Sequence, residues 1–111
     1  MIEKVILDYL SEGASVPVWM SRPEKPPAKY ILVEKTGSSR ANRVTTSTFA
    51  IQSYAPTLYE AAQLNEEVKS LMDGADTLTE VSAAKLSTDY NYTNAATKQP
   101  RYQAVFNVTH Y

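Results

Sequence analysis

Side chains able to carry out acid–base, nucleophilic or metal chemistry are few in this chain of 111 residues. It contains no cysteine and a single histidine, His110, so thiolate metal sites, cysteine nucleophiles and multi-histidine metal clusters are excluded. The three glycines, Gly13, Gly37 and Gly74, stand too far apart to form a phosphate-binding loop or a dinucleotide fingerprint. We therefore predict that the protein is not an enzyme, with no catalytic residues, no metal and no cofactor.

Charge and aromatic content narrow the classes of binding partner. Eleven Lys and Arg residues against twelve Asp and Glu residues leave a net charge of -1, which argues against a general polyanion-binding protein. Basic residues still gather at Arg40 and Arg43, and at Lys98 and Arg101. With the eight tyrosines they are candidates for a nucleic-acid contact surface. The alternatives are a solvated turn for the arginines and an aromatic ladder over the core for the tyrosines.

Two segments have apolar residues at helical spacing. The first runs from Ile2 to Gly13, with acidic residues on its other side. The second follows a capping box, in which Thr57 and Glu60 satisfy each other's backbone amides, and is expected to end at Met72. The sequence thus predicts two amphipathic helices.

Four segments have the alternation or the apolar run of β-strands: residues 29–36, 44–54, 80–92 and 101–109. Residues 15–21 contain Pro17, which favours an edge strand or an extended segment, and the proline-rich residues 22–28 form a stiff connector. Residues 37–43 are small, polar or basic and are expected to be an exposed, mobile turn. In the third strand, the period of two predicts one face with Ala84, Leu86, Thr88, Tyr90 and Tyr92. The opposite face is predicted to hold Lys85, Ser87, Asp89 and Asn91.

The order of these elements is typical of an α+β fold. We expect an antiparallel β-sheet of about four strands with the two α-helices packed on one face, because this arrangement buries every apolar stripe. The length suits one domain over residues 1–111. No apolar run approaches the ~20 residues that span a bilayer and no cleavable signal is visible, so we expect a soluble protein with no membrane partner.

Three stretches together resemble a group of bacteriophage proteins: VPVWMSRPEKPPAKYILVEKTG, TFAIQSYAPTLYEAAQLNEEVK and DYNYTNAATKQPRYQAVFNVTHY. They are similar to head–tail joining proteins of tailed phages and prophages of Gram-positive hosts, related to tail terminator or tail completion proteins. The similarity covers nearly the whole chain from Val16 to Tyr111, and RYQAVFNVTHY is its most characteristic piece.

The resemblance implies a tail-terminator-like domain that forms a ring, commonly a hexamer, on the head-proximal end of the tail tube. Such a ring ends tube growth and offers a surface for head attachment. The implied partners are further copies of the chain, the major tail tube protein, a head-side connector or stopper protein and, non-specifically, DNA in the lumen. The implied location is the virion, and the host cytoplasm during assembly.

The candidate assembly-interface residues are Trp19, Arg40, Arg43, Lys98 and Arg101. Trp19 stands beside a proline-containing extended segment, where it is either a core residue or an interface anchor. Two alternatives to the terminator remain open: another neck or head–tail connector component, and a nucleic-acid contact module in the DNA channel.

Overall fold

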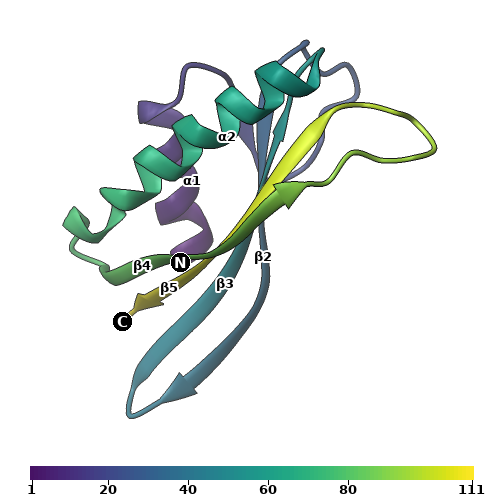
Figure 1. The fold of residues 1–111 in the computed structure, drawn as a ribbon. Coiled ribbons are helices and arrows are strands. Elements are labelled where there is room, and N and C mark those ends of the chain that lie inside the picture. Colours follow the sequence, from purple (N-terminus) through teal and green to yellow (C-terminus); the bar gives the residue numbers. More distant parts are fainter.

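A computed structural model describes residues 1–111 as a five-stranded sheet with two helices on one face (Figure 1). In chain order the elements are α1 (Ile2–Gly13), β1 (Val18–Trp19), β2 (Tyr30–Ala41), β3 (Val44–Tyr54), α2 (Leu58–Asp73), the 3-10 helix η1 (Ala75–Thr77), β4 (Val81–Asn91) and β5 (Arg101–His110). The expected α+β fold with both helices on one face is confirmed. Neither helix combines the length and the apolar character needed to cross a membrane.

The strands lie in the order β1-β2-β3-β5-β4. All neighbours are antiparallel except β1 and β2, which pair in parallel through Val18 and Trp19 only. The sheet is therefore mixed and has one strand more than expected. This fifth strand is the proline-containing segment that was expected to be an edge strand or extended, and its two residues are too short a run for periodicity to detect.

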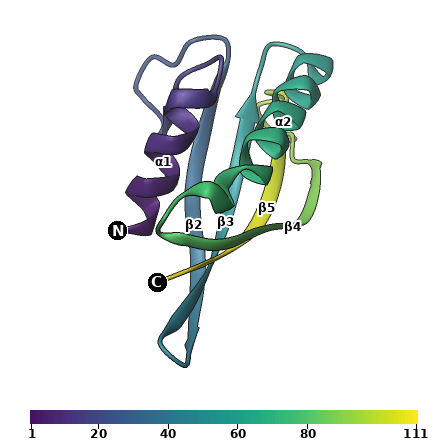
Figure 2. The ribbon, with the colours of Figure 1, turned by 90° about the vertical axis from the view of Figure 1, so that its left-hand side faces the viewer.

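The two helices divide the sheet between them (Figure 2). α1 contacts β1 and β2, whereas α2 contacts β3, β5 and β4. The Thr57 hydroxyl accepts a hydrogen bond from the Glu60 amide at 3.2 Å, which confirms the Thr57 half of the predicted capping box. The Glu60 carboxylate does not return the bond and lies 3.9 Å from the Lys29 ammonium group instead. Where the helices meet, the Tyr9 hydroxyl donates to the Leu71 carbonyl at 2.6 Å, and a Cβ at Gly74 would lie 2.9 Å from that hydroxyl. A side chain at Gly74 would therefore push the Tyr9 hydroxyl away from its hydrogen bond with Leu71.

The core lies between the helices and the central strands β3 and β5. Phe49 stands opposite Phe106, and Ile51 opposite Ala104, all with their side chains turned toward the helices and fully or almost fully buried. The alternate residues of the same strands lie on the face that no helix covers, here called the open face. Strand alternation therefore separates an apolar face from a more polar one, as the period of two predicted.

The predicted turn over residues 37–43 is wrong in extent. β2 continues to Ala41 and pairs with β3 up to that residue, with one register irregularity at Thr36, so the turn is only Asn42 and Arg43. Their φ values of 51° and 67° are those of a two-residue hairpin turn of type I′, whose twist matches that of the strands. Residues 37–43 are exposed as expected, but they form a projecting hairpin (Figure 1).

The predicted faces of β4 are also partly wrong. β4 has an irregular register between Leu86 and Thr88, which leaves Ser87 unpaired. Leu86 and Asp89 therefore lie opposite core residues of β5, whereas Tyr90 lies opposite Gln103 on the open face. A β-bulge of this kind reverses the alternation for every later residue of the strand.

Candidate functional surfaces

The five predicted interface residues lie at two opposite ends of the sheet. Arg40 pairs with Thr45 at the start of β3, and Arg101 pairs with Tyr54 at its end. These nine residue steps along β3 correspond to roughly 30 Å. The structure therefore divides the candidate residues into one group with Arg40 and Arg43, and a second group with Trp19, Lys98 and Arg101.

The first group lies on the hairpin of residues 37–44, here called the arm. Every residue of the arm before Val44 is exposed, and neither Arg40 nor Arg43 makes an ion pair. Arg43 has a left-handed backbone conformation, which costs a residue with a side chain about 1–2 kcal/mol relative to its ordinary conformations. The turn thus keeps a cation at a position that glycine would occupy more easily.

The second group surrounds three aromatic rings on the open face, here called the tyrosine end: Tyr30, Tyr54 and Tyr92. The rings of Tyr30 and Tyr54 stack with 4.5 Å between centroids, and the Trp19 ring lies 6.0 Å from that of Tyr30. Tyr30 and Tyr54 are buried and Trp19 is half-buried. Trp19 therefore packs against the Tyr30 ring and keeps part of its surface exposed.

Arg101 is held in place at the tyrosine end by several contacts. Its guanidinium carbon lies 4.4 Å from the centre of the Tyr92 ring, within the range of a cation–π interaction. Its Nη1 donates to the Tyr54 hydroxyl at 2.9 Å and its Nε to the Tyr92 carbonyl at 2.5 Å. Its remaining guanidinium donors are not engaged in these contacts. Arg101 is thus oriented by its neighbours before any partner arrives.

Lys98 lies close to this group in the β4–β5 loop, residues 92–100. Like Arg43 it has a left-handed backbone, with φ of 56°. Its amide donates to the Asn94 carbonyl at 2.7 Å, and the Asn94 side chain accepts from the Ala96 amide at 2.8 Å. The loop is therefore folded on itself by its own hydrogen bonds, although its side chains are exposed.

The ion pairs of the molecule are all made by lysines. Lys4, Lys29, Lys35 and Lys69 form the five pairs with carboxylates. None of the four arginines takes part in one. Arginine is the residue best suited to bidentate binding of oxyanions, so the arginines at both ends of the sheet remain available for a partner.

The open face between these two ends is tied together by side-chain hydrogen bonds. Gln52 donates to Gln103 at 2.8 Å, Gln103 donates to the Tyr90 hydroxyl at 2.5 Å, and the Tyr54 hydroxyl donates to Gln52 at 3.0 Å. These bonds satisfy the polar groups of Gln52, Gln103 and Tyr54, which are half-buried or buried although no helix lies above them, and connect them to the exposed Tyr90. The face is therefore ordered without a covering layer.

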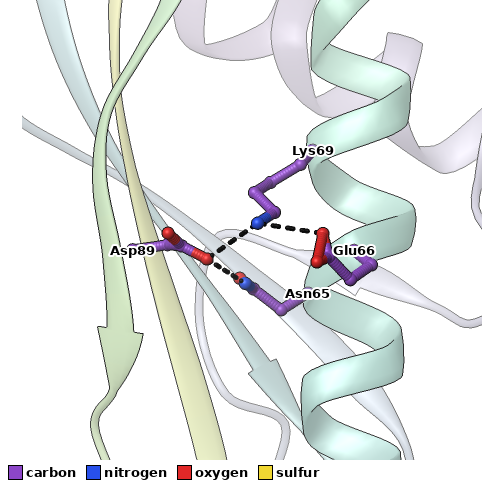
Figure 3. Close-up of polar contacts among 4 residues, drawn as sticks. All are labelled: Asn65, Glu66, Lys69 and Asp89. Carbon is purple, nitrogen blue, oxygen red and sulfur yellow. Dashed lines mark hydrogen bonds and ion pairs between the residues drawn. The ribbon is translucent and has the colours of Figure 1, made fainter.

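A second polar cluster connects α2 to β4 on the covered side (Figure 3). Asp89 accepts hydrogen bonds from Lys69 at 3.0 Å and from Asn65 at 2.8 Å, and Lys69 also pairs with Glu66 at 2.9 Å. The hydrogen bond from Lys69, followed by that from Asn65, holds the pKa of Asp89 below its usual value, and the bonds to Glu66 and Asp89 raise the pKa of Lys69. Both groups are therefore fixed in their charged forms at neutral pH, which suits a structural cross-link better than proton transfer.

Sequence reasoning missed one pair of residues that could do chemistry. His110 Nε2 lies 2.8 Å from the Ser47 hydroxyl, the spacing of a nucleophile and its base. Ser47 is only 1% exposed, and the group near the other ring nitrogen is the Tyr111 carbonyl at 3.3 Å, not a carboxylate. The pair therefore satisfies two buried polar side chains across β3 and β5. Only the register of these strands brings them together, and no local motif signals it.

Neither models of known protein families nor curated protein sequences give a match to this chain. No group of three or more His, Asp or Glu side chains comes together in a geometry that could hold a metal ion. The geometry therefore offers two surfaces for a functional argument, the arm and the tyrosine end, which share a pattern of exposed or preoriented arginines.

Proposed function

We propose that the chain is a structural virion assembly protein of the tail-terminator type. Copies of it would form a ring on the head-proximal end of a phage tail tube, end tube growth and provide the surface for head attachment. The proposal rests first on the sequence resemblance, which spans nearly the whole chain. Its partners would be further copies of itself, the major tail tube protein and a head-side connector or stopper protein.

The edges of the sheet support a head-to-tail contact between copies. A closed ring needs two different complementary surfaces on each subunit. β1 covers only Ile31 and Leu32, so the outer edge of β2 is free from Val33 to the tip of the arm. β2 has one register irregularity, between Lys35 and Gly37, and is regular from Gly37 to Ala41. At the other side of the sheet, β4 has two register irregularities, and such irregularities hinder pairing with a further strand. The two edges are thus different, and the arm is the longer regular part of the β2 edge that is open to strand pairing.

The structural observation that carries the proposal is the arm. It projects past the helices, makes no contribution to the core and ends in Arg43, whose strained backbone is retained at the tip. Strain of this kind persists where the side chain has a use. Such an arm is suited to reaching a neighbouring subunit or the tube protein.

Complementation of a phage that lacks the gene tests this function. The double substitution Arg40→Ala and Arg43→Ala should leave thermal stability nearly unchanged while lowering the yield of tails that accept heads. The matched control is Lys25→Ala with Lys85→Ala, which removes two other exposed cations without ion-pair partners and should complement normally.

Two results would contradict the proposal. A normal infectious yield from the Arg40/Arg43 variant would show that these arginines are not needed for head joining. If electron microscopy of purified tails placed the protein away from the head-proximal end, or as a single copy, the protein would not be a tail terminator.

A nucleic-acid contact module is the second candidate, because all four arginines lack carboxylate partners. Phosphate contacts release counterions, so DNA affinity would fall steeply as salt concentration rises. Salt-insensitive incorporation into tails, with no DNA binding at low salt, would favour assembly alone.

A further inference from the structure

A buried hydroxyl group at the tyrosine end has no hydrogen-bond partner. Tyr30 is 0% exposed, and its hydroxyl oxygen is one of three buried side-chain polar atoms without a partner. Such groups destabilise a fold, so each one calls for an explanation. Because the Tyr30 ring stacks on Tyr54, its hydroxyl is fixed in position and cannot turn out to water.

A small hollow lies at the β4–β5 loop, and Tyr54, on which Tyr30 stacks, is one of its lining residues, whereas Tyr30 itself is not. Its volume is about 50 Å³, and its lining residues are Arg22, Tyr54, Asn94, Thr97, Gln99 and Arg101. Every one of these side chains carries a hydrogen-bond donor, and none is a carboxylate. The hollow is thus small, polar and positively charged.

The electrostatics at Tyr30 connect its hydroxyl to this hollow. Burial raises the pKa of Tyr30, so the hydroxyl stays protonated at neutral pH and is available as a donor. The charge of Arg22, the Gln99 side chain, which approaches the phenol oxygen as a hydrogen-bond donor, and the charge of Arg101 each lower this pKa in part. The hydrogen of the hydroxyl itself still has no acceptor. The hydroxyl therefore lies behind the lining of the hollow, next to residues that form this lining.

We propose that this hollow binds a single phosphate group. Arg22 and Arg101 would supply the positive charge, and the side-chain amides of Asn94 and Gln99 would donate hydrogen bonds. The Tyr30 hydroxyl, which lies behind this lining, would donate as well once the Gln99 side chain shifts toward the ligand. Arginine pairs and several converging donors match the acceptor oxygens of a tetrahedral oxyanion, and the volume limits the ligand to one such group. Free inorganic phosphate and a phosphate of a nucleic-acid backbone share this chemistry. The proposal does not depend on ring formation.

Titration of the full chain with inorganic phosphate, followed by NMR at constant ionic strength, tests the site. Saturable shifts should appear at Tyr30, at the Arg22 and Arg101 side chains and in residues 92–100, with a dissociation constant on the order of 1 mM. Arg22→Gln should weaken binding by about ten-fold or more, because a charge-assisted bond is lost.

The matched control is Arg40→Gln, which removes an arginine without an ion pair from the other end of the sheet and should leave the affinity unchanged. Equal affinity of the Arg22→Gln and Arg40→Gln variants would overturn the proposal. So would the absence of saturable shifts at these residues in the unsubstituted protein.

Tyr30→Phe tests the hydroxyl without disturbing the ring stack. In the absence of phosphate the variant should unfold at the same temperature or higher, because it lacks the unpartnered group. Phosphate should raise the unfolding temperature of the variant by less than that of the unsubstituted protein. An equal rise in both proteins would show that the hydroxyl does not take part in phosphate binding.

Competition with a short single-stranded DNA separates the two sources of phosphate. If the DNA displaces inorganic phosphate, and Arg22→Gln lowers the affinity for both ligands, the site binds a phosphate of the nucleic-acid backbone. If phosphate binds and the DNA does not displace it, the site is one for the free anion.

Discussion

The two faces of the sheet are made from the same strands but are stabilised in different ways. Toward the helices, β3 and β5 present apolar side chains such as Phe49 and Phe106, which are buried between two layers. On the open face the alternate residues Gln52 and Gln103 are joined by hydrogen bonds, with the aromatic rings of the tyrosine end at one extremity. Burial of apolar area stabilises a fold far more than a half-exposed hydrogen bond does.

This difference indicates that the covered face provides most of the stability, whereas the candidate residues for recognition lie elsewhere on the surface. Substitutions on the covered face should change the free energy of unfolding strongly, and those on the arm or at the half-exposed residues of the open face should change it little. The buried ring stack of Tyr30 and Tyr54 is the exception on the open face. The candidate binding residues Arg22, Arg40 and Arg43 are all exposed, away from the apolar layer. They can therefore be replaced while the fold is kept, which is what functional tests require.

The largest effect is expected when β5 is removed. β5 lies between β3 and β4, so a chain that ends at Pro100 loses both ladders and the covered-face residues Ala104, Phe106 and Val108. Such a chain should not fold, as judged by loss of cooperative urea unfolding. A cooperative transition at a similar midpoint would mean that β5 is not essential to either face.

Next in size is the contrast between two neighbours on β5. Phe106→Ala should lower the free energy of unfolding by about 3–5 kcal/mol, because Phe106 is almost fully buried on the covered face. Val105→Ala, on the open face and half-buried, should cost roughly 1 kcal/mol or less. Similar losses in the two variants, measured by urea unfolding, would abolish the distinction between the faces.

The cluster between α2 and β4 should have an intermediate, pH-dependent effect. Asp89→Asn should cost about 1–2 kcal/mol at pH 7, because Lys69 then loses one of its two carboxylates. The folded-state pKa of Asp89 is lowered, so its stabilisation is complete above the ordinary aspartate value of about 3.9 and disappears as the pH falls through the folded-state pKa.

Urea unfolding of both proteins between pH 7 and pH 2 measures this dependence. The difference between the unsubstituted protein and Asp89→Asn should shrink toward acid pH. A difference independent of pH would show that packing of the side chain, and not its charge, is responsible.

The smallest effect is expected at the tip of the arm. Arg43→Gly should raise the free energy of unfolding by no more than about 1 kcal/mol, because glycine relieves the left-handed strain but adds flexibility to the unfolded chain. Arg40→Gly is the control: Arg40 lies in β2 without a positive φ, so glycine should destabilise there by roughly 0.5–1 kcal/mol. In thermal unfolding, the Arg43→Gly variant should be more stable than the unsubstituted protein and the Arg40→Gly variant less stable.

The parts of the fold that could be predicted are those with a strong local apolar pattern. The second helix was expected to end at Met72 and ends at Asp73, and the strand expected over residues 44–54 is β3 with the same bounds. Both elements have many buried side chains at the spacing that their geometry demands.

The parts that could not be predicted depend on pairing between distant residues or on exposed backbone. The outer half of β2 is a strand because β3 pairs with it, and its small polar side chains give no apolar signal. The irregularity at Ser87 reverses the faces of Asp89 and Tyr90, which a simple period of two places the other way. For the same reason, the polar cluster of Figure 3 and the hollow at the β4–β5 loop had no signature in the sequence.

The strand order also determines how the chain reaches its native state. The two-residue turn lets β2 and β3 meet as a local hairpin on a timescale of about 1–10 μs, whereas β3 and β5 join residues as distant in sequence as Thr45 and His110. Non-local pairing of this kind forms slowly, so one edge of β3 stays unpaired until β5 joins it. In that interval the β5 of another copy can occupy the place, which gives an entangled dimer. Rapid dilution to low protein concentration should therefore give the highest yield of correctly refolded monomer.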